Sequence, residues 1–178
     1  MPRGSEAIQH GLSIIDEGFV SVADLHSREF QIFLKYWHLI KGKRLAPPFV
    51  EFDFLKLPPE LVPNILLSEV DADGDDFVIG FCGPDLAEHF GSVLEGRSTR
   101  GLNGNGQACS LHTAHSRTAD EMVPIAACIP LTGISGRPQE TANILLLPLS
   151  EDGIGADKII SYVECAGWSW RSIWWRFK

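Results

Sequence analysis

Residues 64–82 read NILLSEVDADGDDFVIGFC, and this stretch decides the fold. Two runs rich in aliphatic and aromatic residues meet at the acidic turn DADGD. The pattern predicts a β-hairpin, because Asp and Gly favour tight turns whereas branched and aromatic side chains favour strands. Toward the C-terminal end, three further runs of the same kind predict three more strands: PIAACIPLTG (124–133), ANILLLPLS (142–150) and KIISYVECA (158–166).

In the segment before the hairpin, DLHSREFQIFLKYWHLIKG (24–42), apolar residues recur at helical spacing, which predicts a helix. Asp24 or Ser27 can cap the start of this helix, and Gly42 can end it. A short helix, PDLAEHFG (84–91), and a longer one, ACSLHTAHSRTADEMV (108–123), follow the hairpin. The order of elements predicts an α+β fold: a five-stranded antiparallel sheet with helices on one face and a flanking N-terminal helix.

Length and charge narrow the function classes. The 178 residues are enough for one domain to bury a core without disulfides or metals. Fifteen basic and twenty-three acidic residues give a formal net charge of -8, which excludes a general nucleic-acid binder, because phosphate backbones attract basic surfaces. The four cysteines form no CxxC pair, and the first eleven residues contain no apolar run for export. We therefore expect a cytoplasmic domain with no membrane span.

Four longer sequence segments match one family: FLKYWHLIKGKR (33–44), LPPELVPNILLSEVD (57–71), FCGPDLAEHFGSVLEGR (81–97) and ILLLPLSEDG (144–153). The chain resembles a bacterial family of short single-domain PAS proteins in these segments, which span roughly residues 30–165, and in the spacing of Gly83, Gly91 and Gly96. Relatives often carry an arginine where this chain has Gly80, and another where Phe49 and Val50 stand. Any anionic contact of those arginines is therefore not carried over.

The resemblance implies a sheet whose concave face, closed by helices, holds a small molecule. It also implies signalling through a change in pairing with a second copy or with another protein. Residues 1–23 are then a loosely attached leader, 24–166 the PAS-like domain and 167–178 an aromatic, basic tail. Because the chain shows no kinase, cyclase or DNA-binding segment, we expect a sensory module that acts through an unidentified signalling protein. An adaptor with no ligand is the alternative.

Candidate ligand-binding residues gather on the predicted helix 108–123. They are Cys109, His112 and His115, joined by Phe81 of the second strand. Two histidines three positions apart share a helical face that suits a metal or a haem iron, but no further ligand has suitable spacing. The cofactor is thus left open, and a haem or metal at the two histidines is not expected. A small enzyme with one of these histidines as general base is a second hypothesis, although no nucleophile motif accompanies it.

Two apolar surfaces predict an interface. The stripe Phe30, Phe33, Leu34 and Trp37 either packs on its own sheet or pairs with the same helix of a second copy. The tail adds Trp170, Trp174 and Trp175, which either complete the core or dock onto a partner. Large exposed apolar patches are uncommon on monomers, so we expect a homodimer. Contact with a membrane surface is not expected, because a short tail with three charges binds weakly alone.

Overall fold

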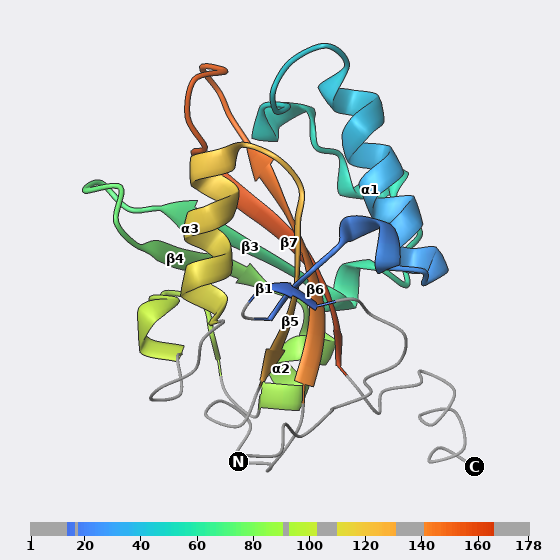
Figure 1. Ribbon diagram of the computed structural model, residues 1–178, viewed down its shortest axis with the longest axis vertical. Helices are drawn as coiled ribbons and strands as arrows, with labels where there is room; N and C mark the ends of the chain where they lie inside the picture. The colour runs from blue at the N-terminus through green and yellow to red at the C-terminus, as the bar shows by residue number, and fades with distance from the viewer. Residues whose placement is uncertain (1–13, 17, 91–92, 103–109, 131–140, 166–178) are drawn as a thin grey trace, which may run out of the picture.

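The computed structural model describes residues 14–16, 18–90, 93–102, 110–130 and 141–165, and it is built on one β-sheet (Figure 1). Seven antiparallel strands form this sheet in the spatial order β1-β2-β5-β6-β7-β3-β4. They are β1 (Ile14–Asp16), β2 (Phe19–Val20), β3 (Ile65–Val70), β4 (Phe77–Cys82), β5 (Ile125–Pro130), β6 (Thr141–Leu149) and β7 (Lys158–Cys165).

The antiparallel α+β prediction is confirmed, but the predicted number of five strands is wrong. The five expected strands are β3 to β7. The additional pair, β1 and β2, continues the sheet beyond β5, where Phe19 pairs with Ala127. These two strands have three and two residues, too few to show the alternation that identifies a strand in a sequence. The described residues of the expected leader thus form a sheet edge.

Helices cover both faces of the sheet: α2 (Pro84–Phe90) and α3 (Leu111–Glu121) lie on one face, and the predicted N-terminal helix α1 (Arg28–Lys41) covers the other. One core lies under α1. The other lies between the sheet and the pair α2 and α3. Figure 1 shows α1 and α3 on opposite sides of the strands. A strand buried on both faces reads as a continuous apolar run, as ILLLPL in β6 does.

The start and end of α1 are set by its caps. The hydroxyl of Ser27 accepts a hydrogen bond from the amide of Phe30 at 3.2 Å, which satisfies one of the free donors of the first turn. Gly42 ends the helix with a φ of 58°, a conformation that favours glycine. Trp37 is fully buried and donates its indole N–H to the carbonyl of Pro148 at 2.8 Å, which fixes α1 on β6.

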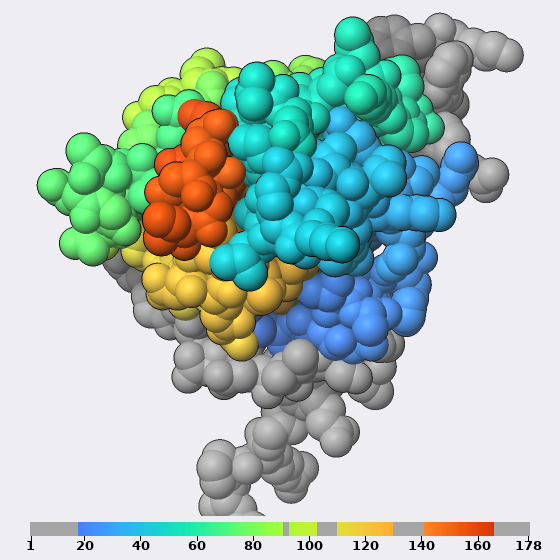
Figure 2. Space-filling model, turned by 90° about the horizontal axis from the view of Figure 1, so that it is seen from above, coloured from blue at the N-terminus to red at the C-terminus, as the bar shows by residue number. Residues whose placement is uncertain are grey.

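An irregular segment after α1 completes this layer. It contains three short 3-10 helices, η2 (Phe49–Glu51), η3 (Phe54–Lys56) and η4 (Val62–Asn64). Two others, η1 (Val22–Asp24) and η5 (Arg100–Leu102), lie before α1 and before α3. Seen from above, the segment after α1 lies beside the β6–β7 turn (Figure 2), where the amide of Ser150 donates to the carbonyl of Pro47 at 2.9 Å.

Gly83 allows α2 to begin directly after β4. A Cβ at this position would lie 2.2 Å from the carbonyl oxygen of Pro63, so no other residue fits without moving the backbone. This close approach gives a structural reason for the first glycine of the spaced set Gly83, Gly91 and Gly96. Gly91 lies outside the described residues.

Candidate functional site

An apolar cavity lies between the sheet and the helices α2, η5 and α3. Its volume is about 30 Å³. Every lining residue is apolar: Leu66, Leu86, Phe90, Leu94, Leu102, Leu111, Ile129, Ala142, Ile144 and Val163. Pockets for drug-sized ligands measure about 300–1,000 Å³. Side chains therefore fill most of the space in which the resemblance would place a small molecule.

His115 lies on the sheet-facing side of α3 and is fully buried. Its Nδ1 is 2.7 Å from the carbonyl oxygen of Leu111, and its Nε2 is 3.1 Å from the hydroxyl of Ser68 on β3. A carbonyl only accepts, so Nδ1 carries the proton and Nε2 accepts from Ser68. Both ring nitrogens are thus occupied. Burial lowers the pKa of His115 to about 4, which keeps the ring neutral.

His112 lies one turn earlier on α3 and is only partly buried. Its Nδ1 is 3.2 Å from the hydroxyl of Thr99 and 3.5 Å from a carboxylate oxygen of Asp76. Partial burial and the guanidinium of Arg100 lower the pKa of His112, and the Asp76 carboxylate raises it less. The Asp76 carboxylate in turn accepts hydrogen bonds from Ser98 at 2.5 Å and from the Phe77 amide at 2.8 Å.

This polar cluster ties α3 to the start of β4 and to the segment before η5. The ring of Phe77 lies between the two histidines, with centroids 5.8 Å from His112 and 5.2 Å from His115. The histidines therefore contact different partners and do not converge on one point. Within the described residues, no group of three or more His, Cys, Asp or Glu side chains is placed to hold a metal ion.

Phe81 does not line the cavity. Alternation from Phe77 and Ile79 predicts that Phe81 faces α3, but Gly80 is an extra residue in β4: Ser68 pairs with Ile79 and the preceding residue of β3 pairs with Phe81. This bulge turns Phe81 to the opposite face, where it packs against the core under α1. Phe81 therefore does not face this cavity, and its ligand-binding role stays a prediction. Cys109 lies outside the described residues.

The predicted interface stripe is mostly core. Phe30, Phe33 and Trp37 are buried under α1, and the ring of Phe33 packs 5.9 Å from that of Tyr162 on β7. Only Leu34 of the four is half-buried at the edge of the helix. The alternative in which the stripe packs on its own sheet thus describes these side chains. Trp170, Trp174 and Trp175 lie outside the described residues.

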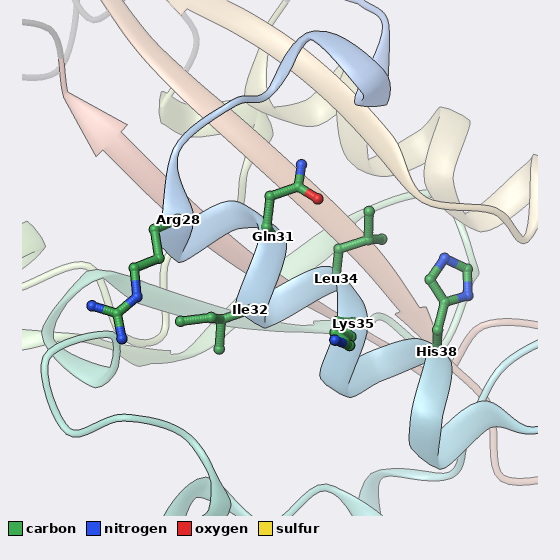
Figure 3. Close-up of a pocket in the computed structure, with 6 residues that line it drawn as sticks. All are labelled: Arg28, Gln31, Ile32, Leu34, Lys35 and His38. Atoms are coloured by element: carbon green, nitrogen blue, oxygen red, sulfur yellow. The ribbon is translucent and has the colours of Figure 1, made fainter.

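A second hollow, of about 480 Å³, lies along the outer side of α1 (Figure 3). Its lining residues are Arg28, Gln31, Ile32, Leu34, Lys35 and His38. Sequence reasoning followed the apolar stripe of this helix and missed its outer face. The available signal was charge: residues 28–44 contain five basic residues and one acidic residue, Glu29, in a chain of net charge -8.

Comparisons with protein-family models, with curated proteins and with solved structures found no match for this chain. Among the described residues, no helix is long and apolar enough to cross a bilayer.

Proposed function

We propose that this chain is a PAS-type protein-interaction module that transmits a signal through a partner protein in the cytoplasm. The order of elements supports the proposal: two long antiparallel strands, then helices, then three long antiparallel strands in one sheet. The sequence predicts the same order for these elements, and this order is similar to that of the PAS fold.

The observation that carries the proposal is the packing between the sheet and α3. The cavity there is about 30 Å³, the described residues that line it are apolar, and His115 on the sheet-facing side of α3 is neutral with both ring nitrogens hydrogen-bonded. An enzyme or a cofactor site needs polar groups that converge on an open space. This face offers a packed core instead, which favours an adaptor whose surface, and not its interior, makes the functional contact.

A sensor of a small apolar molecule is the second candidate, and the cavity itself favours it. The described residues that line the cavity are apolar, and half of them are leucine, which suits an apolar ligand. Leu94 and Leu102 both come from the segment 93–102, which ends in η5 and closes the cavity from outside the main helices.

Native mass spectrometry of freshly purified full-length protein distinguishes the two. The adaptor predicts the mass of the polypeptide alone, or of its oligomer, under conditions that retain non-covalent ligands. A small molecule bound at one copy per chain, and released on denaturation, would overturn the adaptor in favour of the sensor.

A further inference from the structure

We infer that the outer face of α1 is a docking site for an acidic, amphipathic helical segment of a partner protein. This inference rests on the proposed interaction function and names the surface that performs it. The site is the hollow of about 480 Å³ along α1, in which Arg28 and Lys35 flank the half-buried Ile32 (Figure 3).

Basic residues outnumber acidic ones on this helix. Residues 28–41 hold three basic residues, Arg28, Lys35 and Lys41, and one acidic residue, Glu29, which leaves twelve basic and twenty-two acidic residues in the remainder of the 178-residue chain. An acidic partner is therefore attracted to α1 and repelled by the rest of the surface, which orients it before contact. Arg28 and Lys35 are exposed, and no ion pair within the described residues engages either.

The position of Arg28 is unfavourable for the helix itself. It is the first residue of α1, where the positive end of the helix dipole disfavours a cation by about 0.3–1 kcal/mol. Residues that break a local rule of stability are expected at functional positions. Within the described residues, no hydrogen bond or ion pair of the Arg28 side chain offsets this effect.

The spacing between the two basic residues determines which partner segment fits. Arg28 and Lys35 are seven residues apart, which is about 10 Å along a helix. Gln31, Leu34 and His38 form a second row beside them (Figure 3). A partner helix with two carboxylates seven residues apart and apolar side chains between them matches both rows. A second copy of α1 does not match, because it would bring Arg28 and Lys35 against the same cations.

An anionic membrane is less well matched than a peptide. The large aromatic side chains of α1, Phe33 and Trp37, point into the core and are fully buried, and the exposed Leu39 does not line the hollow. The hollow therefore offers no aromatic or fully exposed apolar residue to insert. The surface is also hollowed, whereas a bilayer meets a flat or protruding face.

The test uses a fluorescent helix-forming peptide with Glu at positions 1 and 8 and Leu at positions 4 and 5, and the full-length protein. Fluorescence anisotropy is expected to show saturable binding that weakens as salt is raised from 50 to 300 mM. The double variant Arg28→Glu, Lys35→Glu is expected to weaken binding at least tenfold. The matched control Lys56→Glu, an exposed charge reversal on η3, is expected to leave it unchanged.

A charge-swapped peptide, with Lys in place of both Glu residues, shows whether a loss of binding reflects the reversed charges or misfolding of the double variant. It is expected to bind the double variant and not the wild type. Equal binding of the Glu peptide to all three proteins, or no binding at all, overturns the α1 site. Binding to vesicles of phosphatidylcholine and phosphatidylserine that Arg28→Glu, Lys35→Glu abolishes, without peptide binding, overturns it in favour of a membrane. Neither outcome bears on the mass-spectrometric test, so the site and the proposed function fail separately.

Discussion

The buried histidine of α3 predicts a loss of stability in mild acid. Above pH 6.5, His115 is neutral in both the folded and the unfolded chain. Below pH 6.5 the unfolded chain binds a proton at this residue, but the folded protein does not until the pH nears its own pKa of about 4. Stability is therefore lost as the pH falls from 6.5 to 4, and His115 has no further effect below that range.

The size of the effect follows from the pKa difference. One pKa unit is worth about 1.4 kcal/mol, so the interval between 6.5 and about 4 corresponds to roughly 3 kcal/mol. About 2 kcal/mol of this is expected between pH 7.5 and pH 5. Full burial justifies using the whole difference without a reduction for solvent screening.

Urea denaturation at several pH values, followed by tryptophan fluorescence, measures the effect in wild type and in His115→Gln. Glu164 and Asp85, whose pKa values burial raises, titrate in both proteins, so the difference between the two curves isolates His115. The wild-type advantage in free energy of unfolding is expected to shrink by about 2 kcal/mol from pH 7.5 to pH 5.

Parallel curves for wild type and His115→Gln would refute the reasoning. If the variant is too unstable to measure, the NMR titration of the His115 ring in wild type gives the same answer. A ring that takes up its proton near pH 6.5 contradicts a neutral, buried His115.

Three further predictions concern the free energy of unfolding, measured by urea denaturation. Phe33→Ala is expected to lower it by about 3–5 kcal/mol at every protein concentration, because the ring packs within one chain; an effect that grows on dilution would instead mark an interface. Gly83→Ala is expected to lower the free energy of unfolding by about 1–3 kcal/mol or more. Gly80→Ala is expected to change it by less than about 1 kcal/mol, because the new Cβ would meet only the Glu69 side chain at 3.7 Å. Equal effects of the two variants would contradict the close approach of Gly83 to Pro63. Ser68→Ala is expected to lower the free energy of unfolding by about 1–3 kcal/mol, because a ring nitrogen of His115 loses its partner. Ser161→Ala is expected to leave it unchanged, because the buried Ser161 hydroxyl has no hydrogen-bond partner in the described structure. A clear loss of stability in Ser161→Ala would contradict this assignment.

The long strands and α1 were predictable because each carries its own local signal. Ser27 and Gly42 mark the ends of α1, and the acidic turn before Phe77 marks the first hairpin. The face that each side chain occupies was less predictable. Phe81 lies on the face opposite to the one that strict alternation predicts, because Gly80 forms a bulge in β4. A shift of one residue cannot be recognised from the alternation of so short a strand.

The candidate site was harder to predict than the fold. His112 and His115 share a helical face, as their spacing requires, yet one is bound inside the core and the other faces Asp76. Their partners, Ser68 and Thr99, come from distant parts of the chain, so only the tertiary structure reveals them. The leucines around the cavity look in sequence like any other core residues. The charge of residues 28–44, in contrast, was visible in the sequence from the start.

An NMR titration of the isotope-labelled full chain tests the central claim most directly, because it compares the surface with the interior in one experiment. The acidic amphipathic peptide is added to one sample and xenon gas, a probe of apolar cavities, to another. The account predicts that the peptide shifts the backbone signals of exposed α1 residues such as Gln31 and Lys35, and that xenon leaves the amides around Leu94 and Leu102 nearly unchanged. Strong xenon shifts around the cavity, with α1 unaffected by the peptide, would contradict an interaction module with a packed core.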